Sequence, residues 1–468
     1  MIEKIFKAYD VRATYPSPLN EEMAWKVGHA TAQFLKRSRA NSGAAPVRME
    51  NTIVVGRDMR PHSPDLAKAL ADGLRSVGMD VIDVGMVDTS FIYFAINHLD
   101  CVGGIMTTAS HNPIQYNGFK ISGPRAKPIG AASGLDDIKR IATTLRVGQT
   151  GLHGKYEERD LWPQYKKHVL QFLDLKRPIK VAIDASNGMA GKMIPAVFGD
   201  VKNLTIVPIL FEITGKFTHD PNPLVESNLE MLKAKMKETP GVDLGACFDG
   251  DADRCMFLDE QRRLVGSDMA TALIAEDFLK REENKGATIV YDLRSSHAVP
   301  DVVKAAGGVP KRDRVGHAFI KKTMAETKAV FGGELSGHLY FRDNWFADSA
   351  AIAFARVLSI LSNDNKPLSQ LIAKYQRYSQ SGEINFQVED KDAKIRELAE
   401  HYKKSQIDYL DGITIEHRGA EGGDWWFNVR KSNTEPLLRL NLETNSPEAL
   451  EQRLKELKRM LGEPVHGH

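Results

Sequence analysis

In the stretch Leu244-Gly245-Ala246-Cys247-Phe248-Asp249-Gly250-Asp251-Ala252-Asp253-Arg254, an apolar run passes directly into an acidic loop. A short apolar run of this kind is typical of a buried strand. In open α/β sheets, ligands bind beyond the carboxyl ends of the strands. The stretch therefore predicts a buried strand that carries a functional loop at its end.

Two further apolar runs also pass directly into polar loops. Val102 to Met106 precedes Thr107-Thr108-Ala109-Ser110-His111-Asn112-Pro113, and Ala329 to Phe331 precedes Gly332-Gly333-Glu334-Leu335-Ser336-Gly337-His338. Upstream of the three loops lie apolar runs that end in aspartate, namely Ile53 to Asp58, Val181 to Asp184 and Ile289 to Asp292. Self-similarity at this long spacing indicates a duplicated domain and not a solenoid repeat.

Helices are predicted between these strands from apolar residues at helical spacing, for example over Glu21 to Arg37 and Pro64 to Val77. The polar segment Ser38 to Asn51 is predicted to be a surface loop. Strands that alternate with helices form parallel sheets. The sequence thus predicts three similar α/β domains with mixed, mainly parallel sheets, whose loops surround one central cleft.

The pattern changes after about residue 372. Ile384 to Val388 and Leu438 to Leu442 alternate apolar and polar residues, as half-buried antiparallel strands do, and a closing helix is predicted over Pro447 to Leu461. This part is predicted to be a C-terminal α+β domain. The four domains are expected at residues 1–151, 152–255, 256–372 and 373–468.

Composition excludes several classes of protein. The 468 residues include 63 Lys+Arg and 61 Asp+Glu, a net charge of +2 that argues against a nucleic-acid partner. The apolar stretch Ala350 to Leu361 is interrupted by Arg356, and the N-terminus lacks the apolar core of a signal peptide, so no membrane association is expected. Three cysteines indicate a reducing compartment, and a cytoplasmic location is predicted.

The acidic loop offers three carboxylates, Asp249, Asp251 and Asp253, that can converge on one hard divalent cation. The alternative is a solvated acidic turn. An EF-hand is rejected because Arg254 stands where that loop needs a glycine and because both flanks are predicted strands. Cys247 and Cys255 lack the further soft ligands of a zinc site, so they are expected in the core.

Ser110 is predicted to begin a helix, where unpaired backbone N–H groups would stabilise a phosphate carried on its hydroxyl. A hydrolase is less favoured, because the G-x-S-x-G elbow is missing around Ser110. Plain helix capping is the alternative interpretation.

Two more loops offer polar groups to a ligand. Arg430-Lys431-Ser432-Asn433-Thr434 has the composition of a phosphate clamp, with an Asx-type turn as the alternative. Glu334, Ser336 and His338 stand between glycines, which suits a sugar, with a glycine-rich turn as the alternative. A phosphate-carrying serine, a cation loop, a sugar loop and a phosphate clamp together indicate phosphoryl transfer on a sugar phosphate.

The chain resembles the α-D-phosphohexomutase superfamily, in particular its bacterial phosphomannomutase/phosphoglucomutase branch. All four loops occur in the family's order. Supporting matches are Phe6-Lys7-Ala8-Tyr9-Asp10-Val11-Arg12, Gly56-Arg57-Asp58, Asn112-Pro113, Tyr116-Asn117-Gly118-Phe119-Lys120 and Gly316-His317-Ala318-Phe319-Ile320-Lys321. The resemblance covers essentially the whole chain.

This resemblance implies that Ser110 is carried as phosphoserine and that Mg²⁺ is held by Asp249, Asp251, Asp253 and a phosphoserine oxygen. The phosphoryl group would pass to a hexose monophosphate and give a hexose 1,6-bisphosphate, which also serves as activator. Arg254 would stabilise the charge of the transferring group. Arg12 and Lys120 are the implied general acid and base, and the lysine is expected to need a depressed pKa.

The remaining implied residues bind the substrate. Glu334 and Ser336 would hold the sugar's 3- and 4-hydroxyls, with His317 and His338 lining the site. The non-reacting phosphate would be gripped by Arg430, Ser432, Asn433 and Thr434, with help from Tyr9. Arg294 occupies a substrate-binding position that is often lysine in this branch, and Ala13 and Asp88-Thr89-Ser90 also differ from the usual family residues.

The resemblance implies an isomerase that interconverts the 1- and 6-phosphates of mannose and glucose, because Glu334-Leu335-Ser336 is close to the Glu-Met-Ser of that branch. A phosphoglucosamine mutase, which typically has Glu-Gln-Ser there, is an alternative. Two other hypotheses are a haloacid-dehalogenase-type phosphatase with Asp249 as nucleophile and a non-catalytic sugar-phosphate-binding protein. A monomer or weak dimer is expected.

Overall fold

A computed structural model describes residues 2–42, 46–146, 151, 153–419, 423–432 and 437–465. Asn433 and Thr434, two residues of the predicted phosphate clamp, lie outside the described residues. The chain forms two compact units. The first unit contains Met1–Gly266 and Ser336–Ser369, and the second contains Ser267–Leu335 and Gln370–His468.

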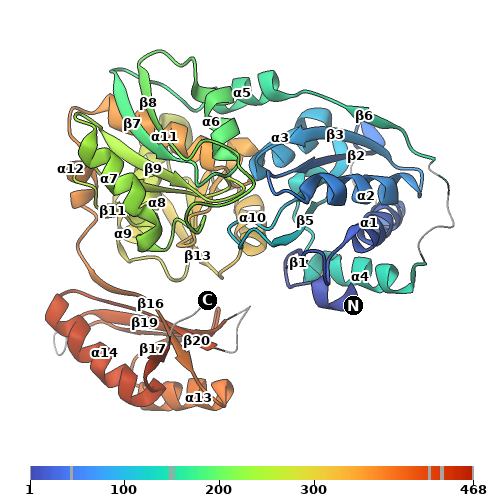
Figure 1. Cartoon of the computed structure of the whole chain (residues 1–468). Coiled ribbons are helices and arrows are strands. Elements are labelled where there is room, and N and C mark those ends of the chain that lie inside the picture. The colour runs from blue at the N-terminus through green and yellow to red at the C-terminus, as the bar shows by residue number, and fades with distance from the viewer. Residues whose placement is uncertain are drawn as a thin grey trace. The chain divides into compact units, whose positions relative to one another are not determined.

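The first unit begins with a six-stranded sheet in the order β1-β5-β4-β2-β3-β6 (Figure 1). The strands are β1 (Val11–Thr14), β2 (Met49–Arg57), β3 (Asp80–Met86), β4 (Cys101–Thr107), β5 (Tyr116–Ser122) and β6 (Tyr156–Glu158). The helices are α1 (Glu21–Ser42), α2 (Ser63–Arg75), α3 (Thr89–Leu99) and α4 (Leu135–Thr144). β2 pairs in parallel with β3 and β4, and β5 is antiparallel to both β4 and β1. The sheet is therefore mixed and its centre is parallel.

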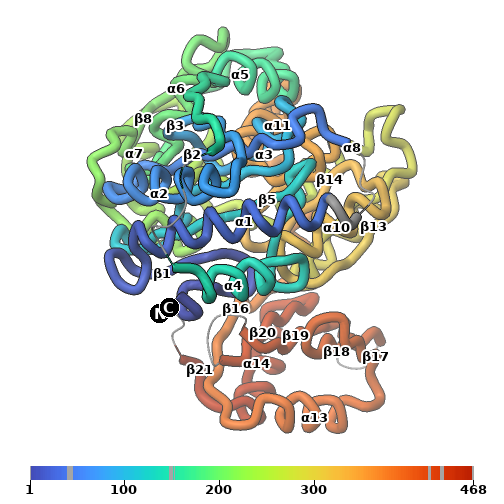
Figure 2. Tube along the Cα trace, turned by 90° about the vertical axis from the view of Figure 1, so that its right-hand side faces the viewer, coloured from blue at the N-terminus to red at the C-terminus, as the bar shows by residue number. Residues whose placement is uncertain are grey.

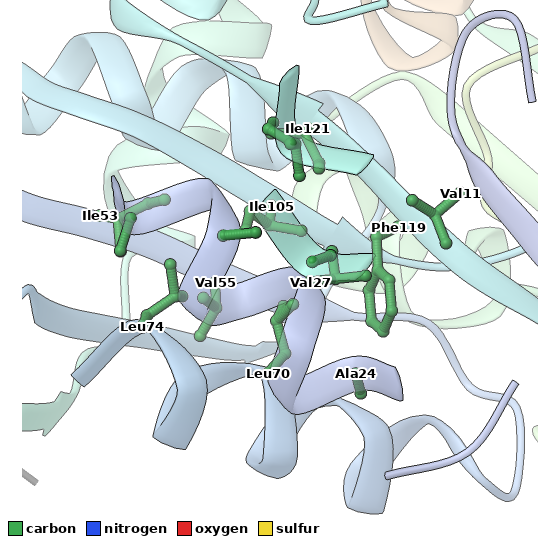
Figure 3. Close-up of a cluster of buried hydrophobic side chains, with 14 of the residues drawn as sticks. Val11, Ala24, Val27, Ile53, Val55, Leu70, Leu74, Ile105, Phe119 and Ile121 are labelled. Atoms are coloured by element: carbon green, nitrogen blue, oxygen red, sulfur yellow. The ribbon is translucent and has the colours of Figure 1, made fainter. Parts of the chain in front are cut away.

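The core of this sheet lies under α1, which packs against α2 and α4 (Figure 2). Figure 3 shows Val27 of α1 and Leu70 of α2 facing Val55 and Phe119 of the sheet. A Cβ on Gly28 would lie 2.1 Å from the carbonyl oxygen of Leu70, so the glycine lets the two helices approach closely. Each fully buried Leu or Phe in such a cluster contributes about 2 kcal/mol to folding.

A second sheet in the first unit has the order β11-β10-β9-β7-β8. Its strands are β7 (Ile179–Asp184), β8 (Leu204–Ile209), β9 (Leu244–Phe248), β10 (Cys255–Leu258) and β11 (Leu264–Val265), and its helices are α5 (Trp162–Leu170), α6 (Ala190–Phe198) and α7 (Glu230–Glu238). β7 pairs in parallel with β8 and β9, whereas β10 returns antiparallel to β9. The acidic loop is the turn between β9 and β10.

A later stretch of the chain completes the first unit. It contains β15 (Leu339–Phe341) and α11 (Ala350–Asn363). The ring of Phe354 on α11 lies 5.1 Å from that of Phe198, and the Arg356 side chain donates a hydrogen bond to the carbonyl oxygen of Phe172 at 3.1 Å. The apolar run that seemed to be interrupted by Arg356 is thus a buried helix whose arginine is paired with the backbone.

The second unit contains a parallel arrangement in which β12 lies between β13 and β14. The strands are β12 (Thr288–Asp292), β13 (Val309–Asp313) and β14 (Phe331–Gly333), and the helices are α8 (Ser267–Leu279), α9 (Ala298–Ala305) and α10 (His317–Thr327). In α12 (Leu368–Ala373) the chain passes from the first unit to the second. β14 begins and ends later than the predicted strand. A Cβ on Gly333 would lie 2.1 Å from Thr271 Oγ1, so this glycine belongs to a strand that packs tightly on α8.

The C-terminal part is an antiparallel sheet in the order β17-β18-β19-β20-β16-β21. Its strands are β16 (Ser379–Gln387), β17 (Gln406–Asp408), β18 (Ile413–His417), β19 (Trp425–Lys431), β20 (Leu437–Thr444) and β21 (Pro464–Val465), and its helices are α13 (Lys391–His401) and α14 (Pro447–Leu461). The Ser446 hydroxyl caps α14 by accepting a hydrogen bond from the Ala449 N–H, and Gly462 follows with φ of 97°. Ser446 thus begins α14 and Gly462 ends it where the sequence predicts.

The predicted fold class is confirmed: three α/β regions with mixed, mainly parallel strands precede an α+β region. The boundaries of the four domains and their shared cleft stay predictions. Cys247 and Cys255 are buried core residues, as expected. Within the described ranges, no helix has both the length and the apolarity needed to cross a membrane.

Candidate active site

The acidic loop lies at the end of β9, a strand in which every residue is buried. Asp249, Asp251 and Asp253 are all at most 2% exposed, and one carboxylate oxygen from each lies within 4.8 Å of the others. The backbone N–H groups of Asp253 and Arg254 donate to Asp249 Oδ1 at 3.1 Å and fix the turn. The alternative of a solvated acidic turn is therefore wrong, because the three carboxylates point inward together.

This donor set fits a hard divalent cation. Asp251 Oδ1 is buried and has no hydrogen-bond partner in the part of the chain that the structure describes. Burial, together with the carboxylate of Asp253, raises the pKa of Asp249 to about 7. Converging carboxylates that are short of hydrogen-bond donors are the ligands that Mg²⁺ prefers in proteins.

Ser110 lies between β4 and β5, directly beside the acidic loop. Its hydroxyl donates to Asp249 Oδ2 at 2.9 Å, and the Arg254 guanidinium donates to the same hydroxyl at 3.1 Å. A Cβ on Gly250 would lie 2.4 Å from the carbonyl oxygen of Ser110, so only glycine permits this approach. The two predicted loops are thus in direct contact.

The prediction that Ser110 begins a helix is wrong. The residues around it form turns that lead into β5, and Ser110 itself has a left-handed backbone with φ of 50°. Its N–H is bonded to Thr108 Oγ1 at 2.9 Å and is not free to bind a phosphate. The groups that can stabilise a phosphate on Ser110 are therefore side chains, Arg254 above all, and not a helix terminus.

Lys120, on β5, places its ammonium 2.7 Å from Asp251 Oδ2 and 2.5 Å from Asp253 Oδ2. Burial lowers the pKa of this lysine, but the two carboxylates outweigh burial and raise the pKa above its usual value. The expectation of a depressed pKa is therefore wrong for these contacts. Opposite charges at this distance favour the protonated ammonium.

Arg12, on β1, donates to the side-chain oxygen of Asn112 at 2.6 Å and forms an ion pair with Asp10. Tyr9, which is half-buried, lies two residues before this strand. Ser336 and His338 belong to the same unit, with Ser336 Oγ 3.0 Å from His338 Nδ1 and His338 Nε2 3.5 Å from Asp253 Oδ1. The first unit thus brings together most of the residues predicted to act in catalysis.

Other predicted residues lie in the second unit. Glu334 accepts a hydrogen bond from the Gly316 N–H at 2.7 Å, which places it beside the start of α10, where His317 is the first residue. Arg294 pairs with Asp292 at 2.8 Å. Ser432 donates its backbone N–H to the carbonyl oxygen of Leu437 at 2.9 Å.

Glu383, on β16, was not predicted from the sequence. Its carboxylate lies 2.8 Å from Arg430, 2.8 Å from Arg439 and 3.4 Å from Arg294. A single glutamate therefore links two predicted substrate-binding arginines that are far apart in sequence. The signal in the sequence that could have indicated Glu383 is a charged residue directly before the strand predicted over Ile384 to Val388.

Two further residues near Ser110 were also missed. Thr89 donates its hydroxyl to Asp251 Oδ2 at 2.6 Å and its N–H to the Asp251 carbonyl oxygen at 3.1 Å. The signal that could have indicated Thr89 is its place in Asp88-Thr89-Ser90, a segment that differs from the usual family residues. The second residue is Arg60, a buried arginine that contacts the Ser110 loop.

Comparison with protein families finds four consecutive matches. The four descriptions all read "Phosphoglucomutase/phosphomannomutase", with alpha/beta/alpha domain I at residues 3–147, domain II at 163–263, domain III at 266–378 and the C-terminal domain at 383–460.

Individual relatives agree over the full length. A phosphomannomutase of Escherichia coli strain K12 is 38% identical, with 98% of this chain and 99% of the relative covered. Phosphohexose mutases of Xanthomonas campestris pv. campestris strain B100 are 37% identical, with 97% and 98% covered. The crystal structure of a phosphoglucomutase/phosphomannomutase family protein from Burkholderia thailandensis has a TM-score of 0.86 and 33% identity, with 98% of this chain and 97% of that chain covered.

Proposed function

Because this chain belongs to the phosphoglucomutase/phosphomannomutase family, we propose that it moves a phosphoryl group between the 1- and 6-positions of mannose and glucose phosphates through a phosphoserine at Ser110. It is a phosphohexomutase, an enzyme of the isomerase class, and acts on hexose phosphates. The proposal concerns the covalent intermediate, the roles of the residues and the identity of the sugars.

The observation that carries the phosphoserine is the position of the Ser110 hydroxyl. It lies 2.9 Å from Asp249 Oδ2 and 3.1 Å from the Arg254 guanidinium. A phosphoryl group on this oxygen would be next to both the acidic loop and a buried cation. In phosphoryl transfer, positioned charges of this kind provide most of the catalysis.

The Mg²⁺ ligands in this proposal are Asp249, Asp251, Asp253 and an oxygen of phosphorylated Ser110. The ion supplies positive charge to the transferring phosphoryl group. Arg254 supplies further positive charge from the protein itself, since a guanidinium stays protonated.

In the forward step, the free hydroxyl of the hexose phosphate forms a bond to phosphorus as the bond from phosphorus to Ser110 Oγ breaks. The hydroxyl loses its proton and Ser110 Oγ gains one. Lys120 is the group proposed to carry this proton, because an ammonium can both donate and, once neutral, accept. Arg12, which cannot deprotonate, is proposed as its cationic partner, held by Asn112.

The hexose 1,6-bisphosphate formed in this step returns its other phosphate to Ser110, so no net phosphate is consumed and added bisphosphate acts as activator. The sugar hydroxyls are assigned to Glu334 and Ser336, with His317, His338 and Arg294 beside the substrate. The phosphate that does not react is assigned to a separate set of residues: Arg430, Ser432, Asn433, Thr434 and Tyr9.

A coupled assay tests the reaction. Mannose 1-phosphate and glucose 1-phosphate are supplied separately with Mg²⁺ and a trace of glucose 1,6-bisphosphate, and formation of the 6-phosphates is followed. Comparable turnover of both supports dual specificity, whereas turnover of glucosamine 1-phosphate alone would replace the sugar assignment. Binding of these sugars without turnover would support a non-catalytic sugar-phosphate-binding protein.

Intact-mass and peptide mass spectrometry test the intermediate. The enzyme treated with bisphosphate should gain one phosphate on the peptide that contains Ser110. Label on Asp249 instead would favour the phosphatase hypothesis. Sedimentation velocity tests the proposal of a monomer or weak dimer.

A further inference from the structure

Arg60 is completely enclosed in the first unit, and its side chain has no exposed surface. A guanidinium has five N–H donors, which spread as a rigid fork. In Arg60 all five are used. Nε donates to Asp58 Oδ2 at 3.1 Å, and the four terminal N–H groups donate to backbone carbonyl oxygens.

The four carbonyl groups all belong to the segment that carries Ser110. One terminal nitrogen donates to the carbonyls of Ser110 at 2.8 Å and Asn112 at 2.7 Å, and the other donates to those of Pro113 at 2.7 Å and Tyr116 at 3.0 Å. Residues 108–115 form turns outside any strand or helix, and Tyr116 begins β5. Arg60 therefore supplies hydrogen bonds to turn residues that belong to no strand or helix.

One strained feature of the segment depends on these bonds. Ser110 has a left-handed backbone, which a non-glycine residue adopts only when surrounding contacts impose it. The bond from Arg60 holds the Ser110 carbonyl, while the hydroxyl of the same residue contacts Asp249 and Arg254.

The Arg60 side chain is also connected to Arg12, the second residue that it is inferred to position. Arg60 holds the backbone carbonyl of Asn112, while the side chain of Asn112 accepts a hydrogen bond from Arg12 at 2.6 Å. One buried residue is thus connected to both Ser110 and Arg12 through the same turn.

We infer that Arg60 is a positioning residue that holds the Ser110 hydroxyl and Arg12 in their reactive geometry. It touches neither substrate nor the transferring group. The inference rests on the proposed function only for its effect on turnover, because the anchoring of the segment can be measured separately.

Arg60→Lys is the test, with Arg356→Lys as matched control. Both substitutions keep a buried charge in the first unit, but Arg356 donates to the carbonyl of Phe172, far from Ser110 in sequence and in a different turn. A lysine has a single nitrogen and cannot satisfy four carbonyls. Hydrogen exchange of the amides in residues 108–118 should rise in Arg60→Lys and stay unchanged in the control.

Steady-state kinetics then distinguish a positioning role of Arg60 from an effect on the stability of the protein. We expect kcat to fall on the order of 100-fold in Arg60→Lys with KM changed less than about threefold, as for a displaced reacting group. Methylguanidinium should restore part of kcat to Arg60→Ala, and methylammonium should not. Three results would each overturn the inference: unchanged hydrogen exchange in Arg60→Lys, unchanged kcat in Arg60→Lys, or an equal loss of kcat in Arg356→Lys.

If Arg60→Ala does not fold, Asp58→Asn takes its place, since it weakens the ion pair that orients the guanidinium. Exchange in the same segment must then rise and kcat must fall while KM is retained, and no change in either would overturn the inference. Absence of mutase turnover in the unsubstituted enzyme would count against the proposed function alone, because the exchange comparison still decides whether Arg60 anchors the segment.

Discussion

The ammonium of Lys120 lies 2.7 Å from Asp251 Oδ2, where it neutralises a carboxylate of the proposed cation site. Lysine and divalent cation therefore compete for the same negative charge. This relationship couples two proposed functions, proton transfer by a residue of β5 and metal binding by the acidic loop.

Lys120→Gln should bind Mg²⁺ several-fold more tightly than the unsubstituted enzyme, because a competing positive charge is removed. At the same time kcat should fall on the order of 100-fold, since a positioned acid or base contributes about that much. Titration calorimetry with Mg²⁺ and the coupled assay measure the two effects. Weaker Mg²⁺ binding in this variant would contradict the competition.

Asp251→Asn should weaken Mg²⁺ binding at least about tenfold, because it removes one of three converging carboxylates. Asp259→Asn is the matched control: Asp259 is equally buried just after β10 but pairs with Arg263 and is not part of the cluster. Calorimetry with Mg²⁺ distinguishes them. Equal losses in both variants would show that the cluster is not the cation site.

Ser110→Ala should abolish nearly all turnover and leave the dissociation constant for hexose phosphate within about threefold of the original, because the hydroxyl acts on the transferring group and not on the bound sugar. Substrate binding is measured by calorimetry, and phosphate incorporation by mass spectrometry. Parallel loss of binding would assign Ser110 to substrate recognition.

Glu383→Gln should raise KM for hexose phosphate on the order of tenfold, or about 1.4 kcal/mol, with little change in kcat. Without the negative charge, Arg294, Arg430 and Arg439 repel one another, and the single amide oxygen cannot replace both carboxylate oxygens that Arg430 and Arg439 contact. Glu389→Gln, exposed just past β16, is the control. A fall in kcat at constant KM would place Glu383 in the chemical step instead.

Stability should depend on pH through Glu443. Its carboxylate accepts hydrogen bonds from the His297 N–H at 2.9 Å and from the Trp426 ring at 2.8 Å, yet burial raises the pKa of Glu443 to about 7. A raised pKa means that the folded state binds the proton more tightly. The resulting stability is complete below the unfolded-state pKa and is lost as pH rises towards 7.

Glu443→Gln keeps the accepting oxygen and cannot ionise. Its advantage in thermal midpoint over the unsubstituted protein should therefore be absent near pH 4.5 and grow to a plateau above pH 7, corresponding to at most about 3 kcal/mol. Calorimetric scans across this range make the measurement. A constant difference at all pH values would show that folding does not shift the pKa of Glu443.

The sequence predicts well those features that depend on local pattern. β9 spans Leu244–Phe248 and α14 spans Pro447–Leu461, as expected from an unbroken apolar run and from a capped amphipathic segment. The convergence of Asp249, Asp251 and Asp253 is also predicted, because closely spaced carboxylates in one loop can converge on the same cation.

Features that depend on contacts between residues far apart in sequence cannot be predicted from such local patterns. Arg60 meets the Ser110 carbonyl 50 residues away, and Glu383 meets Arg430 47 residues away, so nothing near either residue marks its role. The helix predicted at Ser110 is absent because side-chain bonds from Thr108 and Arg60 satisfy its backbone. The loop predicted over Ser38 to Asn51 is shortened because α1 continues to Ser42 and Arg39 bonds to the carbonyl of Glu50.

The return of the chain to the first unit through α11 has a consequence for its synthesis. Phe354 and Arg356 complete contacts with Phe198 and with the carbonyl of Phe172, but the ribosome makes them only after the whole of β12 to β14. Domains fold as their residues emerge from the ribosome. The first unit therefore cannot finish folding until α11 is made. Until then the apolar surface that α11 covers is exposed, where chaperones can bind or misfolding can begin. A stall or truncation before residue 350 would leave all of the Ser110 and aspartate loops present and yet no finished unit to hold them.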